Sequence, residues 1–301
     1  MELRHLRYFV CVADELHFGR AARRLGVSQP PLSQQIRALE QILGVQLFDR
    51  TSRKVTLTEP GRLFLEEARQ TLAQADRAIN VAKRAARGDY GRLSVGFNPS
   101  AAFVQDVAHA IFVFRQSCPD VEVELSELSS GEQVAALAAR EIDIGFLRSA
   151  FPPVLPDGIV ATRILEERLH VAMRPDHRLA AKKSLAFADL DREPMILYAW
   201  HQKGSFAGQL LETLHADGVQ PVIAQDVGEI STLFGLVAAG LGITVLAESL
   251  CALQPAKLTY RPLRGRRALS SMWLIASDQP TPAAANFLAI LSASRSEDGP
   301  G

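Results

Sequence analysis

The sequence predicts an α/β protein in which a small helical module precedes a long helix and a larger domain of alternating strands and helices. Three observations predict this order. A helix-turn-helix pattern lies near the N-terminus, an unbroken helical pattern follows it, and strand-like runs alternate with helical runs after Gly91. With 301 residues, of which 48% are hydrophobic and 22% charged, the chain is long enough for two or three cores.

Residues 18–40 read as two short helices joined by a tight turn. Small Ala22 lies four residues before Gly26, where the backbone must turn sharply, and Ser28 is placed to cap the second helix. Apolar residues then repeat at the spacing of a buried helix face. The opposite face would present side chains to base edges in a DNA groove, namely Gln29, Pro30, Pro31, Ser33, Gln34 and Arg37. Spacing alone also allows an ordinary surface hairpin of helices.

A helix before this pair and a β-hairpin after it would complete the module. Apolar residues recur at helical spacing between Leu3 and Leu16, and residues 46–58 hold two short apolar runs around a polar tip. A charged hairpin tip is usually just solvated. Because this hairpin follows a recognition helix, we interpret it as a wing that contacts phosphates through Arg50, Arg53 and Lys54.

Charge is segregated along the chain, although the total is neutral with 33 basic and 33 acidic residues. Residues 1–88 contain 15 Lys+Arg and 9 Asp+Glu, an excess of six positive charges, so the remainder carries six excess negative charges. A basic N-terminal module on a mildly acidic body favours contact with DNA phosphates at one end only.

A long helix is expected after the wing. Thr58 can cap it, Pro60 lies in its first turn, and the pattern runs to Arg87, where Gly88 can end it. A heptad seam of alternating large and small residues runs along it, consisting of Leu65, Ala68, Leu72, Ala75, Ile79, Ala82 and Ala86. The seam needs a partner, either its own domain or a second chain. We favour self-association, because the helix extends past so small a module.

The larger domain reads as two α/β lobes with a cleft between them. Strands are expected at residues 93–97, 121–125, 142–146, 169–173, 195–198, 222–224, 243–246 and 272–276, and helices at 101–116, 132–139, 208–216 and 230–239. Ligands of such sheets bind where strands end and helices begin, because helix N-termini present unpaired N–H groups.

Two strand-to-helix turns carry hydroxyl groups beside such N–H groups, and they contain Asn98, Pro99, Ser100, Ser129 and Ser130. These residues are candidates for binding an anionic ligand, and Arg148, just past another strand, could add a cation. The alternative for each serine is helix capping, which can coexist with ligand binding, and for Arg148 it is a surface salt bridge.

The sequence gives little support to an enzyme, a metalloprotein, a secreted protein or a membrane protein. The sequence contains no nucleophile elbow, zinc-protease or P-loop motif, so we assign no catalytic residue, cofactor or metal, and the Gly-rich run at 235–242 reads as a helix end. Three widely spaced cysteines argue against disulfides and zinc sites. No signal peptide or long apolar run occurs, which predicts a cytoplasmic protein without membrane contact. A two-lobed solute-binding protein, or an enzyme with an accessory DNA-binding module, remains the alternative.

The sequence resembles the LysR-type transcriptional regulators over nearly its whole length. The motifs LRYFV, AARRLGVSQPPLSQQIRALEQILGVQLFDR and LTEPG carry the likeness, with Pro60 where the family commonly has Ala. The resemblance implies a winged helix-turn-helix at 1–59, a linker and dimerisation helix at 60–88, and a periplasmic-binding-protein-like effector domain at 89–301. Lobe I would comprise 89–163 and 266–295, and lobe II 164–265.

Within the family, LSVGFNPSAAF, REIDIGFLR and GLVAAGLGIT are similar to the branch that controls degradation of aromatic compounds. The resemblance implies a muconate or aromatic carboxylate as effector, bound by Ser100, Ser130, Gly204, Ser205, Phe206 and Val227. At the position of Ser130, members of that branch commonly have Thr. In the amide-donating loop they have prolines where this chain has residues 201–204. The resemblance further implies double-stranded DNA as partner, a dimer through the linker helix, a tetramer, activation as much as repression, and RNA polymerase as a further contact.

Overall fold

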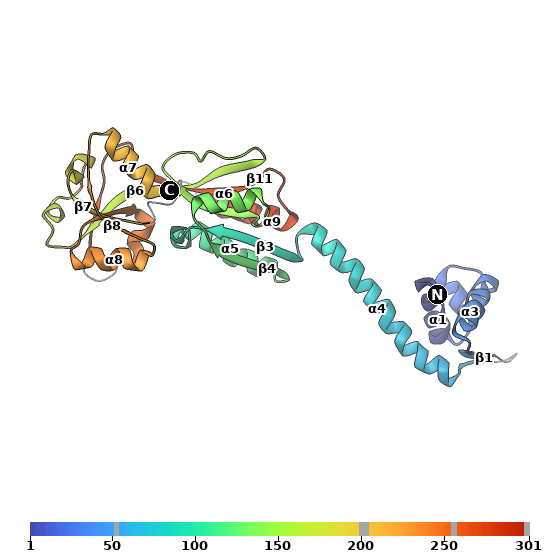
Figure 1. Ribbon diagram of the computed structural model, residues 1–301. Helices are drawn as coiled ribbons and strands as arrows, with labels where there is room; N and C mark the ends of the chain where they lie inside the picture. Colours follow the sequence, from blue (N-terminus) through green and yellow to red (C-terminus); the bar gives the residue numbers. More distant parts are fainter. Residues whose placement is uncertain (51–53, 199–204, 254–257, 298–301) are drawn as a thin grey trace. The chain divides into compact units, whose positions relative to one another are not determined.

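The computed structural model describes residues 1–50, 54–198, 205–253 and 258–297. The chain divides into two compact units, residues 1–84 and residues 85–301. Each unit has a hydrophobic core of its own. Figure 1 shows the helices and strands of both units.

The first unit is a small helical domain with a hairpin. It contains α1 (Leu3–Glu15), α2 (Phe18–Leu25), α3 (Gln29–Leu43), the antiparallel strands β1 (Phe48–Arg50) and β2 (Val55–Leu57), and most of α4 (Glu59–Arg87). Its core combines apolar side chains from the helices and the hairpin, among them Leu6, Phe9, Ala21, Leu32, Ile36, Leu39 and Phe48. The predicted helix-turn-helix, preceding helix and wing strands are therefore confirmed, and the hairpin tip at 51–53 lies outside the described residues.

Two glycines of this unit are required by its backbone, one for its left-handed conformation and one for a close approach. Gly26 ends α2 with φ +67°, in the left-handed region that a Cβ disfavours, as predicted. A Cβ on Gly61 would lie 2.0 Å from the carbonyl oxygen of Leu47. Thr58 caps α4 as predicted, since its Oγ1 accepts a hydrogen bond from the N–H of Gly61 at 3.0 Å. Ser28 holds the N-cap position of α3, but the predicted capping bond is absent from its side chain.

The apolar seam of α4 divides into two halves. Ala68 is 1% exposed, and Leu65 and Leu72 pack against the core of the first unit, whereas Ile79 is 47% exposed. The seam thus contacts its own unit through the N-terminal half and leaves the C-terminal half exposed. The helix has 29 residues, and Gly88 follows it with φ +76°, so both predicted ends are correct within one residue.

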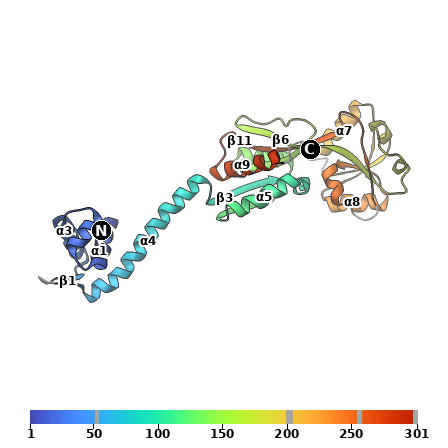
Figure 2. The ribbon, with the colours of Figure 1, turned by 180° about the vertical axis from the view of Figure 1, so that it is seen from behind.

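Lobe I of the second unit contains the parallel strands β3 (Gly91–Phe97), β4 (Val121–Glu127) and β5 (Ile144–Ser149), and β11 (Leu269–Ser277) pairs antiparallel with β5. The helices α5 (Gln105–Ser117) and α9 (Pro282–Glu297) pack on one face of the sheet, and α6 (Ser130–Ala138) on the other (Figures 1 and 2). Alternation along β11 explains this, because Met272 and Leu274 face α5 and α9 while Ile275 faces α6.

Lobe II is a second α/β layer structure. The parallel strands β7 (Pro194–Tyr198) and β8 (Val222–Val227) pair, and β9 (Thr244–Ala247) and β10 (Thr259–Pro262) flank the end of β6 (Ile159–Met173). The helices α7 (Phe206–Ala216) and α8 (Ile230–Ala239) pack against opposite faces of β6. The adjacent residues Val171 and Ala172 point to opposite faces, and Val171 belongs to the hydrophobic cluster that contains α7, whereas Ala172 belongs to the one that contains α8.

The two lobes share β6, which crosses between them. Residues 159–168 of β6 pair with β11, and the strand pairs with β9 from Leu169 onward. Ile164 belongs to the core of lobe I and Ala268 to that of lobe II. The strand pairing and the cores change from lobe I to lobe II near 168/169 on β6 and near 268/269 at the start of β11, a few residues beyond the predicted boundaries at about 163/164 and 265/266.

Two further observed elements differ from the predicted ones, because the apolar pattern of the sequence does not indicate them. The helix expected at 101–116 consists of a 3-10 turn, η1 (Pro99–Phe103), followed by α5, because Val104 is extended. The first part of β6 was missed, since charged residues interrupt its apolar alternation. In the described part of the chain, no helix combines the length and apolarity that crossing a membrane requires.

Candidate functional site

The helix α3 exposes one face along its N-terminal half. Its apolar positions Leu32, Ile36 and Leu39 are fully buried, which turns the predicted recognition residues away from the core. Of these, Gln29, Pro30, Pro31, Gln34 and Arg37 are exposed and Ser33 is half-buried. The surface at the start of α3 therefore offers amide, hydroxyl and guanidinium groups together, which are the groups that bind base edges and phosphates.

Arg50 in the wing is held by the first unit itself. Its Nη2 lies 2.6 Å from Oε2 of Glu40, and its guanidinium lies 5.0 Å from the centroid of the Phe18 ring. Glu40 is 9% exposed and accepts hydrogen bonds from two backbone N–H groups before and at β1. Arg50 thus stabilises the wing. Neither this role nor the part that Glu40 plays in it was predicted from the sequence. Of the other predicted cations, Lys54 is exposed and Arg53 lies outside the described residues.

A cavity of about 230 Å³ lies in the second unit, with walls from both lobes. It is lined by the predicted residues Asn98, Pro99, Ser100, Ser129, Ser130, Arg148, Ser205 and Phe206. Gly204 lies outside the described residues. The predicted residue Val227 is not among the lining residues: its side chain is 8% exposed and packs against Ile196 and Leu233, and the next residue, Gly228, lines the cavity.

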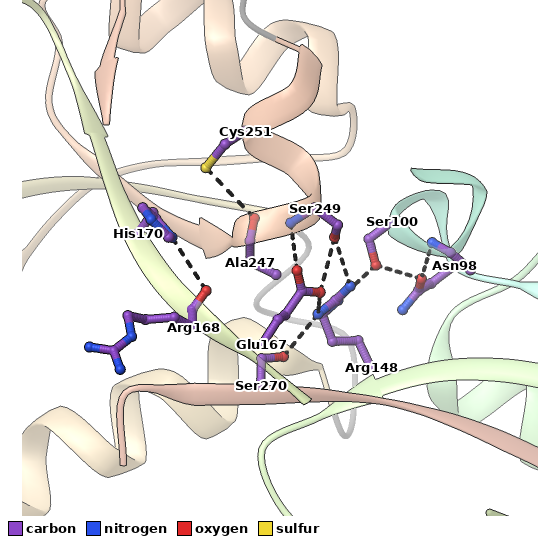
Figure 3. Close-up of polar contacts among 11 residues, drawn as sticks. Asn98, Ser100, Arg148, Glu167, Arg168, His170, Ala247, Ser249, Cys251 and Ser270 are labelled. Atoms are coloured by element: carbon purple, nitrogen blue, oxygen red, sulfur yellow. Dashed lines mark hydrogen bonds and ion pairs between the residues drawn. The ribbon is translucent and has the colours of Figure 1, made fainter. Parts of the chain in front are cut away.

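Ser100 is fixed in the wall of the cavity by two partners (Figure 3). Its hydroxyl donates to Oδ1 of Asn98 at 2.8 Å and accepts from Nε of Arg148 at 2.9 Å. Asn98 caps η1 by accepting from the N–H of Ala101 at 3.1 Å. Asn98 therefore performs the capping predicted for Ser100, and the Ser100 hydroxyl must exchange a partner to donate to a ligand.

Arg148 is neither a free cation nor part of a surface salt bridge. Its Nη1 lies 2.6 Å from Oε1 of Glu167, and the two side chains are 4% and 6% exposed. Further hydrogen bonds run from Nη1 to Ser270 and from Nη2 to Ser249, each at 3.2 Å. Burial lowers the pKa of Arg148, but the Glu167 carboxylate counteracts this, and the guanidinium stays charged at neutral pH. The predicted cation is therefore already balanced inside the protein.

The ion pair also joins the two lobes. Glu167 lies on β6 just before the crossing, and its carboxylate accepts hydrogen bonds from the N–H and hydroxyl of Ser249, at 2.5 and 3.0 Å. Ser249 belongs to η4 (Glu248–Leu253) of lobe II, whereas Arg148 ends β5 of lobe I (Figure 3). Glu167 and Ser249 were not predicted from the sequence, because no motif distinguishes a buried glutamate within a charged strand.

Two helix N-termini complete the polar wall. Ser129 caps α6, as the helix-capping alternative predicted, and it forms a capping box with Glu132 whose hydrogen bonds lower the pKa of Glu132. Ser205 caps α7 by accepting from the N–H of Gly208 at 3.1 Å. The first-turn N–H groups of Ser130 and Phe206 have no acceptor within their helices, so they can bind an anion.

The rest of the lining is mostly apolar, with Leu197, Leu210, Ile230, Phe234 and Leu246 among the side chains. A mainly apolar cavity with a few convergent donors is typical of a site for a small organic molecule. Over the described ranges, no group of three His, Cys, Asp or Glu side chains is arranged to hold a metal ion.

Comparison with known proteins identifies both units. Residues 3–62 match the family described as bacterial regulatory helix-turn-helix protein, lysR family, and residues 86–295 match the LysR substrate binding domain. The chain is 41% identical to the uncharacterized HTH-type transcriptional regulator YnfL of Escherichia coli over 95% of this chain and 96% of that protein. It is 38% identical to the HTH-type transcriptional regulator AlsR of Bacillus subtilis, with 96% and 95% covered.

Solved structures agree with these matches. The crystal structure of full-length CbnR complexed with its target DNA superposes with a TM-score of 0.81 at 32% identity, covering 98% of this chain and 99% of that one. The likeness therefore extends over both units and the helix that connects them.

Proposed function

Because the chain belongs to the LysR family of transcriptional regulators, a family of DNA-binding regulators with an effector-binding domain, we propose that a small organic acid, a muconate or an aromatic carboxylate, switches this one. The observation that carries the proposal is the convergence of η1, α6 and α7 on one cavity between the lobes. Family membership in a class of regulators speaks against the enzyme and transport-protein alternatives.

The carboxylate is bound by neutral donors rather than by a free cation. Arg148 is balanced by Glu167, so the negative charge meets the N–H groups and hydroxyls at the starts of α6 and α7. Ser130 is the strongest candidate, because its hydroxyl has no hydrogen-bond partner in the described parts of the chain. The apolar lining then holds the body of the acid.

On the DNA side, Gln29, Ser33 and Gln34 read base edges, while Arg37 and the wing contact phosphates. A second copy contacts the exposed half of the α4 seam, where Ile79 is 47% exposed. Such a dimer supplies the two recognition helices that a two-fold symmetric DNA site requires. A tetramer, and contact with RNA polymerase, extend the same proposal.

Switching requires that the effector bind two arrangements of the lobes with different affinity. The coupling free energy in such systems is typically about 1 to 3 kcal/mol. The buried pair Arg148–Glu167 connects the cavity wall to lobe II through Ser249, so an acid that engages Ser100 also acts on the contacts between the lobes.

The effector proposal is tested with Ser130→Ala. Titration calorimetry with benzoate and with cis,cis-muconate should show binding to the parent protein and at least a tenfold loss of affinity in the variant. The thermal stability without ligand should be unchanged, because the hydroxyl has no internal partner. Ser117→Ala, at an exposed position of α5 outside the cavity, is the matched control. Equal affinity in both variants would remove Ser130 from the site.

The DNA proposal is tested with Gln29→Ala and Ser33→Ala. Each should weaken binding to the duplex upstream of the protein's own gene by about 1 to 3 kcal/mol and leave binding to scrambled duplex intact. Gln41→Ala, exposed in the last turns of the same helix, should change neither. An equal loss on both duplexes would show that these residues do not read bases.

A further inference from the structure

The lobe II wall of the cavity contains two hydroxyls that the fold does not use. Thr244, at the start of β9, is 1% exposed and lines the cavity. Tyr198, at the end of β7, is half-buried and lines it too. Neither hydroxyl has a hydrogen-bond partner in the ranges that the structure describes. Native proteins leave few buried hydroxyls unpaired, because removing a polar group from water without compensation is unfavourable.

The position of Thr244 on its strand directs it toward the ligand space. Side chains alternate along a strand, so Thr244 shares a face of β9 with Leu246. Leu246 packs against Phe234 and Leu250, and all three line the cavity. An isosteric apolar residue would suit this face better than threonine unless something in the cavity bonds to the hydroxyl.

The surroundings of Tyr198 indicate which kind of group binds there. Burial and the carboxylates of Glu127 and Glu229 raise the pKa of Tyr198, so its phenol stays protonated and can donate a hydrogen bond. Glu127 also lines the cavity. These carboxylates would repel a second anionic group, whereas an uncharged hydroxyl or amide can bind to both unused hydroxyls.

We propose that Thr244 and Tyr198 form a second polar subsite, which binds an uncharged hydroxyl or amide group of the effector at the lobe II wall of the cavity. The inference rests on the proposed function, because it assumes that a carboxylate binds at the lobe I wall. It narrows the effector class from organic acids in general to monocarboxylates that carry a distant hydroxyl or amide, and it disfavours dicarboxylates.

The test compares benzoate, 3-hydroxybenzoate, 4-hydroxybenzoate and terephthalate by titration calorimetry on the full-length protein. At least one hydroxybenzoate should bind about tenfold more tightly than benzoate, and terephthalate more weakly than that hydroxybenzoate, since one hydrogen bond in a desolvated site contributes about that factor. Thr244→Val should abolish the preference, and Thr244→Ser should retain it.

A matched control separates ligand recognition from folding. Thr213 of α7 is also buried, but its hydroxyl donates to the carbonyl of Gln209 at 2.8 Å. Thr213→Val should therefore lower the melting temperature and keep the hydroxybenzoate preference, while Thr244→Val should keep or raise the melting temperature. Benzoate binding as tightly as both hydroxybenzoates, or a preference that survives Thr244→Val, would overturn the subsite. If neither these acids nor cis,cis-muconate binds the parent protein, the proposed function itself fails.

Discussion

Replacing Glu167 by glutamine should destabilise the second unit strongly, because it removes the counter-charge of a buried guanidinium. Arg148 is 4% exposed and Glu167 6% exposed, with the charged atoms 2.6 Å apart. Breaking a buried ion pair by removing one partner costs about 3 to 5 kcal/mol, since an uncompensated charge remains in the interior. For a unit of this size, that corresponds to a fall in melting temperature of roughly 6 to 20 °C.

The chain offers a matched control on the same strand. Glu166 pairs with Arg163 at the same distance of 2.6 Å, but the two side chains are 53% and 43% exposed. Glu166→Gln should cost less than about 1 kcal/mol, because water screens a surface pair. The comparison therefore isolates burial as the cause.

Urea denaturation followed by tryptophan fluorescence measures both variants. Trp200 and Trp273 are the two tryptophans of the sequence, and both belong to the second unit, so the signal reports that unit. Replacing both members of the pair with methionine should cost less than Glu167→Gln alone. If Glu167→Gln and Glu166→Gln cost the same, the argument that Arg148 depends on Glu167 is refuted.

Three further predictions concern packing, pH and thiol chemistry. Gly61→Ala should abolish stable folding of the first unit, because its Cβ would lie 2.0 Å from a backbone oxygen, whereas Gly44→Ala, in open space with φ +71°, should cost about 1 to 2 kcal/mol. Hydrogen exchange of the backbone amides of α1 and α3 measures the stability of the first unit in both variants. Lys182 lowers the pKa of Asp189, so this carboxylate stabilises the fold above its ordinary pKa of 3.8 and loses that effect as the pH falls further. Asp189→Asn should therefore show a shallower fall of melting temperature between about pH 5 and pH 3. Burial raises the pKa of Cys251 to about 12, so a thiol reagent should label it only on unfolding.

Each of these has a contrary outcome. A folded Gly61→Ala variant with native exchange rates would mean that the start of α4 can shift away from the loop. If the melting temperature of Asp189→Asn falls as steeply at acid pH as that of the parent protein, other carboxylates dominate the loss of stability in acid. Rapid labelling of half-buried Cys251 in the native protein would contradict the raised pKa of its thiol.

The sequence predicted the first unit well because its signals are local. Gly26, Thr58 and Gly88 mark element ends by their backbone or capping chemistry, and the apolar spacing of α3 determines which side chains face outward. It also placed the strand-to-helix turns of the cavity, since Asn98 and Ser129 are capping residues in their local sequence. Of the predicted site residues, Arg53 and Gly204 lie outside the described parts of the chain.

By itself, the sequence determined the order of most elements, the outward face of α3 and most of the polar wall of the cavity, because each depends on residues within one or two turns of each other. Tertiary structure alone showed that Glu167 balances the charge of Arg148 and that buried Thr244 lines the cavity. Whether a charge is free or balanced, and whether a hydroxyl is paired, depends on partners up to 122 residues away, as Arg148 and Ser270 illustrate. Burial and pairing of this kind arise from the packing of distant strands, which no local pattern encodes.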